Sequence, residues 1–398
     1  MRKYKLLKKA ILVLLAGSFL TAFGWGLATG IYRTLPFPLV ENLNSLIKQE
    51  QHLNGQSLNK QITKLEKSPK LIRSLIQVKN TTELDKKRSA LIDFIWSGDG
   101  FPVEQLPNEV TINYPDKRYS DISSLSQIDK LKIIMRYGIE SNIYYFHTNN
   151  NKSRTRSCLM IYHQGHGGDF ILGRHVIKRW LSKGCDVLGI SMPLVGMNNH
   201  PIVNLPKFGP VQLIEHNNFR LLISKDLSPI SFFLTPVTVA LNHALNKNNY
   251  QYIGMMGLSG GGWTTTVYSA IDPRINVSYP VAGSLPFFLR NLSKNRFNQT
   301  SWGDFEQDYQ ALYNIANYLE LYVLGADRDR RQLQVLNLFD SCCFSGNFHS
   351  TYEPIVASVA LNLGGSFEVL LDKTHKQHMI SEYALDIIAK DFFNFIQK

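Results

Sequence analysis

The 398-residue sequence predicts an α/β fold built on a mostly parallel, doubly wound sheet. Strand-like and helical segments alternate from residue 157 to the C-terminus, whereas the segments between residues 109 and 147 are strand-like without helices between them. The strand-like segment 250–256 leads directly into Gly257-Leu258-Ser259-Gly260-Gly261, and a helix-forming stretch follows. A strand that turns sharply into a helix at a G-x-S-x-G sequence presents its serine outward.

Residues 1–33 predict a membrane anchor. Five basic residues precede an uncharged run of 23 residues from Ala10 to Tyr32, which is longer than the ~20 residues of a membrane span. We therefore expect a signal-anchor transmembrane helix, with the rest of the chain on the non-cytoplasmic side (periplasmic, lumenal or extracellular). A cleaved signal peptide is the alternative, although no clear Ala-x-Ala site is visible.

Residues 34–105 predict a helical spacer or cap, because their apolar residues recur at helical spacing and no chemical motif is present. Residues 106–398 then form the main domain, beginning with strands and continuing with alternating strands and helices. Its expected strands are Glu109–Tyr114, Leu131–Arg136, Asn142–His147, Ser157–His163, Cys185–Ser191, Tyr250–Met256, Asn276–Gly283, Gln332–Leu338 and Phe367–Leu371. Its expected helices include Val176–Lys183, Pro236–Leu245, Pro354–Leu363 and Ser381–Ile396.

Residues 284–331 predict an insertion, since they are too many for a plain connection and are rich in Phe, Tyr, Asn and Leu. Their helical core, about Phe305–Leu324, suits a lid over a binding site.

Charge and cysteine content exclude several classes of protein. The formal net charge is +12, but six of the 43 Lys and Arg lie in residues 1–33, and neither a zinc-finger spacing nor an aromatic-rich basic module is present. We therefore expect no nucleic-acid partner. The four cysteines are too few for a disulfide framework; buried thiols are expected at Cys158 and Cys185, and adjacent Cys342 and Cys343 rarely pair with each other.

Three features together resemble the α/β-hydrolase superfamily, in its serine esterase and prolyl-oligopeptidase-like branch. They are the turn at Ser259, the glycine-rich string His163-Gln164-Gly165-His166-Gly167-Gly168 after a strand, and histidines between the last strand and the last helix. The resemblance spans about residues 109–398 and implies an α/β-hydrolase fold. It also implies a nucleophilic Ser259, which needs an imidazole base and a carboxylate to orient that imidazole.

The base implied by this resemblance is His378, with His375 as the alternative. Both lie in the loop that follows the last strand, but His378 directly precedes the apolar pair Met379-Ile380 that leads into the closing helix, whereas His375 has polar neighbours.

The implied acid is Asp340. The family carries its carboxylate after the strand that follows the insertion, often as Gly-x-x-Asp, and here Asn337 stands where Gly is usual. Asp304, Asp327 and Asp329 stay as alternatives, although the arginines around Asp327 and Asp329 suggest a solvated helix end. Asp272 fits less well, because it follows the helix that starts at the serine.

Two backbone N–H groups are expected to bind the oxyanion of the tetrahedral intermediate. The resemblance implies Gly260 as one donor and the loop after residue 163 as the source of the other. Gln164 is inserted into the family's His-Gly-x-Gly-Gly pattern, so the second donor is either His166, which we favour, or Gly165. A metal site at His163, His166 and His175 lacks an acidic partner in the sequence, so we expect no metal and no cofactor.

The function implied is that of an exported serine hydrolase that cleaves a small-molecule or lipid-like carboxylic ester through a Ser-His-Asp triad and an acyl-enzyme. A serine peptidase of the prolyl-oligopeptidase type shares these loops and is one alternative. A membrane-anchored binding protein that kept the fold without activity is the other, since Gln164 and Asn337 depart from the family pattern.

Overall fold

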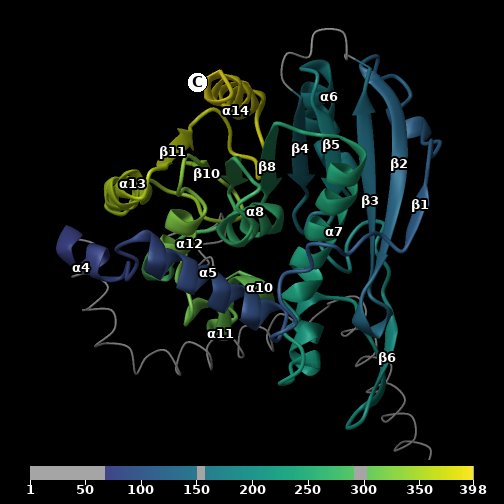
Figure 1. Ribbon diagram of the computed structural model, residues 1–398, viewed down its shortest axis with the longest axis horizontal. Coiled ribbons are helices and arrows are strands. Elements are labelled where there is room, and N and C mark those ends of the chain that lie inside the picture. The colour runs from purple at the N-terminus through teal and green to yellow at the C-terminus, as the bar shows by residue number, and fades with distance from the viewer. Residues whose placement is uncertain (1–67, 150–156, 291–302, 398) are drawn as a thin grey trace, which may run out of the picture. The chain divides into compact units, whose positions relative to one another are not determined.

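A computed structural model describes residues 68–149, 157–290 and 303–397, all within one compact unit, Leu65–Lys398 (Figure 1). Nine strands form one sheet in the order β1-β2-β3-β5-β4-β8-β9-β10-β11. The first four strands in this order pair antiparallel, and the strands from β5 to β11 are parallel neighbours. The predicted fold class is therefore confirmed.

The strands agree with the segments expected from the sequence, except that β2 starts at Leu125, six residues before the expected start at Leu131. They are β1 (Glu109–Thr111), β2 (Leu125–Ile134), β3 (Glu140–Thr148), β4 (Cys158–His163), β5 (Asp186–Ile190), β8 (Tyr252–Leu258), β9 (Val277–Val281), β10 (Arg331–Asn337) and β11 (Ser366–Asp372). A separate antiparallel pair, β6 (Ile202–Leu205) and β7 (Gly209–Gln212), was not expected.

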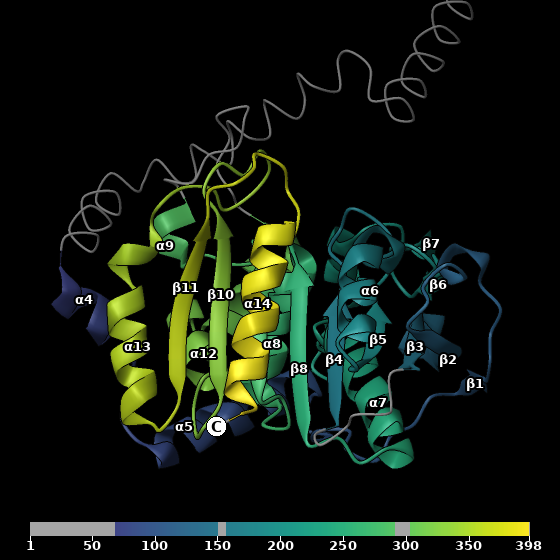
Figure 2. The ribbon, with the colours of Figure 1, turned by 90° about the horizontal axis from the view of Figure 1, so that it is seen from above.

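Helices cover both faces of the sheet (Figure 2). One face carries α6 (Arg174–Ser182) and α14 (Glu382–Phe395). The other carries α5 (Thr81–Ile95), α7 (Ser231–Lys247), α8 (Gly260–Ile271), α12 (Tyr318–Leu324) and α13 (Glu353–Asn362). The remaining helices are α4 (Pro69–Ser74), α9 (Phe287–Arg290), α10 (Phe305–Asp308), α11 (Gln310–Tyr313) and the 3₁₀ helices η1 (Lys117–Tyr119), η2 (Arg136–Gly138), η4 (Phe170–Gly173), η5 (His216–Leu222) and η6 (His349–Thr351).

The two layers of helices explain why the central strands are apolar throughout. In β4, Leu159 and Ile161 belong to the core under α7 and α8, whereas Met160 and Tyr162 belong to the core under α6 and α14. Successive side chains of a strand point to opposite faces, so a strand buried on both faces becomes a continuous apolar run.

The predicted lid helix is broken into short helices. Tyr309, with φ −65° and ψ 91°, separates α10 from α11. The Asn317 side chain accepts hydrogen bonds from the N–H groups of Leu319 and Glu320 and starts α12 anew. Such a cap satisfies N–H groups that the first turn of a helix leaves free, so the chain begins a new helix there.

Both cysteine expectations are wrong in this structure. Cys158 is joined to Cys185 by a disulfide, and Cys342 is joined to Cys343. The first bond links the starts of two neighbouring parallel strands, β4 and β5, which pairing in the sheet brings together.

The structure also corrects the predicted localisation. Across the described ranges no helix has both the length and the apolar character that a bilayer crossing requires. The longest of these helices, α7, has 17 residues, whereas a span needs ~20. The anchor expected at residues 1–33 lies outside the described residues. The predicted membrane-anchored localisation is therefore contradicted by this finding and is not used below.

Candidate active site

Ser259 occupies a sharp turn between β8 and α8. Its φ of 57° and ψ of −122° are a conformation that non-glycine residues rarely adopt. A Cβ on Gly257 would lie 2.3 Å from Gly261 O, and a Cβ on Gly261 would lie 2.0 Å from His163 O. The two outer glycines of the motif are therefore required because the backbone passes too close for any side chain.

The loop after β4 packs against this turn. A Cβ on Gly165 would lie only 2.6 Å from Ser259 Cβ and 2.5 Å from Leu258 O. The His166 ring occupies the space beside Gly260, since a Cβ on Gly260 would lie 2.5 Å from His166 Cε1. The three expected oxyanion donors, Gly165, His166 and Gly260, are thus brought together next to Ser259.

Asp340 and His378 form a hydrogen-bonded pair at the carboxyl ends of β10 and β11. His378 Nδ1 lies 2.8 Å from Asp340 Oδ2, so the Nδ1–H donates to a carboxylate that is almost fully buried. His378 Nε2 is buried and makes no hydrogen bond with any residue that the structure describes. The ring is therefore held by one nitrogen, and the other nitrogen is left to act as a proton acceptor.

Three further hydrogen bonds fix the Asp340 carboxylate. The backbone N–H groups of Cys342 and Cys343 donate to Oδ1 over 2.8 and 3.1 Å. Asn337 Nδ2 lies 3.1 Å from Asp340 Oδ2 and 3.0 Å from the carbonyl oxygen of Met379, the residue after His378. The departure from Gly at residue 337 thus adds an amide that ties the carboxylate to the histidine loop.

His375 lies beside a different carboxylate. Its Nε2 is 3.2 Å from Asp372 Oδ2, and Asp372 also accepts hydrogen bonds from Ser381 Oγ and from the N–H and hydroxyl of Thr374. Burial alone would raise the pKa of Asp372, but these hydrogen bonds and the nearby His375 outweigh burial and lower the pKa below its usual value. Only His378, of the two histidines considered, contacts Asp340.

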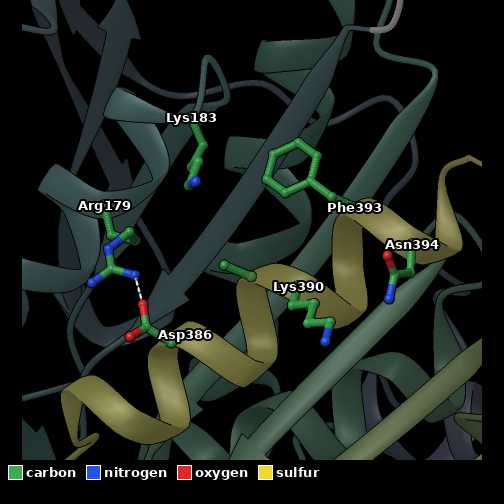
Figure 3. Close-up of a pocket in the computed structure, with 7 residues that line it drawn as sticks. Arg179, Lys183, Asp386, Lys390, Phe393 and Asn394 are labelled. Atoms are coloured by element: carbon green, nitrogen blue, oxygen red, sulfur yellow. Dashed lines mark hydrogen bonds and ion pairs between the residues drawn. The ribbon is translucent and has the colours of Figure 1, made fainter.

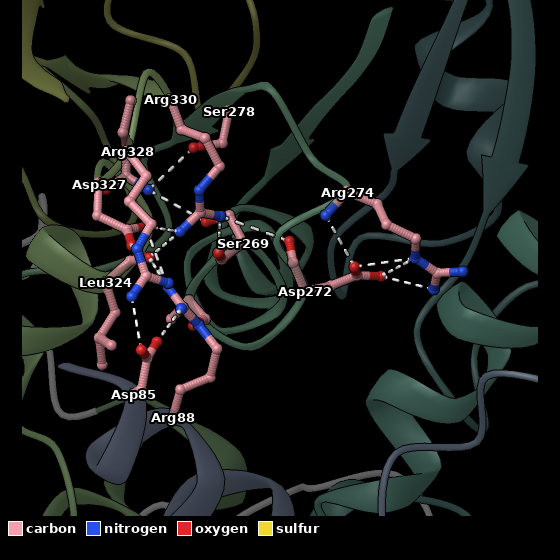
Figure 4. A network of polar contacts seen from close by, with 12 residues as sticks. Asp85, Arg88, Ser269, Asp272, Arg274, Ser278, Leu324, Asp327, Arg328 and Arg330 are labelled. Atoms are coloured by element: carbon pink, nitrogen blue, oxygen red, sulfur yellow. Dashed lines mark hydrogen bonds and ion pairs between the residues drawn. The ribbon is translucent and has the colours of Figure 1, made fainter. Parts of the chain in front are cut away.

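Asp327 and Asp272 have structural partners of their own. Asp327 is fully buried beneath α5, 3.0 Å from Arg88 and in contact with Arg330, as Figure 4 shows. The expectation of a solvated helix end there is wrong, because α5 covers it. Asp272 pairs with Arg274 over 2.7 Å, and Asp329 has a left-handed φ of 64° in the exposed turn before β10.

The sequence analysis missed a cluster of polar side chains behind the oxyanion loop. His166 Nε2 lies 3.0 Å from Glu306 Oε1 and 3.2 Å from Asp304 Oδ2, and His216 Nδ1 lies 3.0 Å from Glu306 Oε2. Burial alone would lower the pKa of His166, but the carboxylates of Glu306 and Asp304 outweigh it and raise the pKa. Burial would likewise raise the pKa of Glu306, yet His216 and His166 hold it well below its usual range. No sequence signal joins residues so far apart in the chain.

His163 and His175 do not join this cluster. His163 is fully buried with Nδ1 2.9 Å from Gln164 O, and burial lowers its pKa to about 4. His175 Nε2 lies 3.1 Å from Ile380 O.

A surface depression between α6 and α14 lies apart from these groups (Figure 3). It is lined by Arg179, Lys183, Asp386, Ala389, Lys390, Phe393 and Asn394. Arg179 and Asp386 form an exposed ion pair across it. None of the residues implied by the sequence for catalysis lines this depression.

Comparison with solved structures decides the fold family. The acetyl xylan esterase from Paenibacillus sp. R4 matches over 81% of this chain and 98% of its own chain, with 16% identity and a TM-score of 0.50. Acetyl xylan esterase 1 from Thermoanaerobacterium sp. JW/SL YS485 matches over 81% and 97%, with 14% identity and a TM-score of 0.52. The chain has the α/β-hydrolase fold.

A third α/β-hydrolase neighbour, methylesterase BT1017, matches over 84% of this chain and 68% of its own, with 13% identity and a TM-score of 0.54. Comparison with protein-family models and with curated protein sequences gives no match. At these identities the similarity concerns the fold, and the chemistry has to be argued from the side chains of this chain.

Proposed function

We propose that this protein is a serine hydrolase that cleaves carboxylic esters through an acyl-enzyme. The observation that carries the proposal is the hydrogen-bonded pair Asp340–His378. Both residues and the strained turn at Ser259 follow the carboxyl ends of parallel strands of one sheet. In an α/β sheet, loops at these strand ends form one edge, which is where ligands bind.

In the first step, Ser259 Oγ attacks the ester carbonyl carbon while His378 Nε2 takes the hydroxyl proton. Asp340 stabilises the imidazolium and keeps Nδ1 protonated. The carbonyl oxygen becomes an oxyanion, bound by the N–H of Gly260 and by an N–H of the loop at Gly165 and His166. When the carbon–oxygen bond to the leaving group breaks, His378 gives its proton to the departing alcohol.

In the second step, water attacks the acyl carbon of the acyl-enzyme and His378 takes a proton from it. Collapse of this second intermediate releases the carboxylic acid and returns the proton to Ser259 Oγ.

Labelling with a fluorophosphonate tests the nucleophile. We expect one label per chain on Ser259, and none in Ser259→Ala. Ser120→Ala, which removes an exposed hydroxyl outside the site, is the matched control and should label like wild type. Folded wild-type protein that stays unlabelled would contradict the proposal and favour a binding protein without activity.

A substrate panel separates esters from peptides. Because two structural neighbours are acetyl xylan esterases, acetyl esters are the first substrates to test, followed by longer acyl chains and aminoacyl amides. We expect ester turnover that is lost in Ser259→Ala. Turnover of amides alone would replace the esterase by a peptidase while keeping the same nucleophile.

A further inference from the structure

Four side chains from three segments converge next to the oxyanion loop. We define the His–carboxylate cluster as His166, His216, Asp304 and Glu306. His166 follows β4, His216 begins η5, Asp304 precedes α10 and Glu306 lies in α10. His166 Nε2 lies 3.1 Å from His216 Nδ1, in addition to its short distances to the two carboxylates.

The cluster holds more acceptors than protons. His216 Nε2 lies 2.8 Å from the carbonyl oxygen of Pro193, which can only accept, so Nε2 carries a proton and a neutral ring has its lone pair on Nδ1. One proton on His166 Nε2 then faces three acceptors: His216 Nδ1, Glu306 Oε1 and Asp304 Oδ2. A buried carboxylate and an imidazole lone pair that share one proton are costly unless a cation compensates them.

Glu306 points to a missing cation most directly. Its side chain is fully buried, and Oε1 accepts no hydrogen bond within the described residues although it lies 3.0 Å from His166 Nε2. An imidazole whose other nitrogen donates to a backbone carbonyl, as His216 does, is typical of metal ligands, because that bond fixes the tautomer.

The distances between donor atoms suit a metal ion. Three separations start from His166 Nε2 and end at His216 Nδ1, Glu306 Oε1 and Asp304 Oδ2, over 3.1, 3.0 and 3.2 Å. They match the edge of a regular tetrahedron whose corners lie about 1.9 Å from its centre, close to the ~2.0 Å of Zn–N and Zn–O bonds. We propose that the His–carboxylate cluster binds one divalent transition-metal ion, with zinc the best match, through His166 Nε2, His216 Nδ1, Glu306 and Asp304. Two imidazoles with two carboxylates suit zinc and its neighbours better than magnesium or calcium.

This site differs from the metal site that the sequence made improbable. His163 and His175 take no part, and the acidic partners come from the middle of the insertion. Asp304 is half exposed and gives an ion a path from solvent, whereas Glu306 closes the site from inside. A bound ion would join the loop beside Ser259 to α10 and η5, so its role is to hold the oxyanion loop in place. The inference does not depend on esterase activity.

Metal binding to the full, untagged chain tests the proposal. After removal of metal with a chelator, the protein is titrated with Zn²⁺ against a chromophoric competitor, and separately with Co²⁺ while its visible spectrum is recorded. We expect one ion per chain and the intense visible bands of four-coordinate Co²⁺. Glu306→Gln and Asp304→Asn should each weaken Zn²⁺ binding at least about tenfold.

Asp129→Asn is the matched control, because it removes the carboxylate of another His–Asp pair, His147–Asp129 at 2.9 Å, and should leave binding unchanged. If Glu306→Gln does not fold, the half-exposed Asp304→Asn decides. Failure of folded wild type to bind Zn²⁺ or Co²⁺ stoichiometrically overturns the proposal. The proposal is also overturned if Asp304→Asn binds Zn²⁺ as tightly as wild type does. It is likewise overturned if Asp129→Asn loses as much Zn²⁺ affinity as the cluster variants do.

Discussion

At the scale of single residues, two histidines in one loop have different partners. His378 donates to Asp340, whereas His375 lies beside Asp372. We expect His378→Ala to lower kcat/KM by roughly 10⁴-fold, since a triad without its base retains only binding and oxyanion stabilisation. His375→Ala should stay close to wild type. Initial rates on an acetyl ester measure both, and the reverse order would assign the base to His375.

Asp372 gives a prediction about acid stability. Its pKa is lowered in the folded protein, so its stabilising effect is complete above the ordinary Asp pKa of ~3.9 and is lost as the pH falls through the lower folded value. At pH 7, Asp372→Asn should cost about 1–3 kcal/mol in the free energy of unfolding. Urea unfolding at pH 7 and below pH 4 should show the difference from wild type shrinking. A constant difference would mean that the charge is not the cause.

At the scale of elements, the loop after β4 and the turn after β8 have no spare space between them. We expect Gly165→Ala to lower kcat/KM at least about 10²-fold, because a methyl group 2.6 Å from Ser259 Cβ must displace the loop or the turn. Gly167→Ala is the control, since a Cβ there meets nothing within 4 Å. Rates of fluorophosphonate labelling compare the two variants. Equal rates would contradict the expectation that the loop after β4 supports the reaction at Ser259.

The contact of α5 with the sheet domain rests on buried charge. Arg88 donates to Asp327 and to the carbonyl oxygens of Ala270 and Leu324. Arg88→Ala should lower the free energy of unfolding by about 3 kcal/mol, because it leaves buried acceptors without a partner. Arg328→Ala breaks an exposed pair with Asp85 and should cost less than about 1 kcal/mol. Urea denaturation compares them, and similar losses would contradict the role of burial.

At the scale of the whole molecule, the proposed ion predicts a change in thermal stability. A ligand that binds only the folded state at about 100 times its Kd adds about 2.7 kcal/mol to the free energy of unfolding. We therefore expect Zn²⁺ to raise the Tm of the metal-free protein by several degrees, and the rise to be clearly smaller in Glu306→Gln at the same Zn²⁺ concentration. Calorimetry with and without a chelator measures the change in Tm. A Tm that does not change when Zn²⁺ is added would count against a structural ion.

Local patterns explain which parts of the fold were predictable. Buried parallel strands are continuous apolar runs, and the turn at Ser259 is encoded by closely spaced glycines, so both follow from short stretches of sequence. The order in which Ser259, Asp340 and His378 follow their strands is also readable. The pairing of Asp340 with His378 rather than His375 requires the structure, because the loop after β11 decides which ring reaches the carboxylate.

Long-range contacts explain what was not predictable. His216 lies 90 residues from Glu306, and Arg88 of α5 lies 239 residues before Asp327, to which it donates. The Cys158–Cys185 bond depends on the pairing of β4 with β5, and the β6–β7 hairpin has strands of only four residues. In each case the missing information is which distant segment becomes a neighbour.

The close approach of backbones around Ser259 has a consequence for changing what the protein accepts. Gly165, Gly257 and Gly261 leave no volume into which variation could introduce a larger group. Attempts to broaden or shift selectivity by directed evolution should therefore spare this junction. They should concentrate their libraries on exposed residues outside this junction and outside the His–carboxylate cluster, whose α10 residue Glu306 contacts the loop beside Ser259.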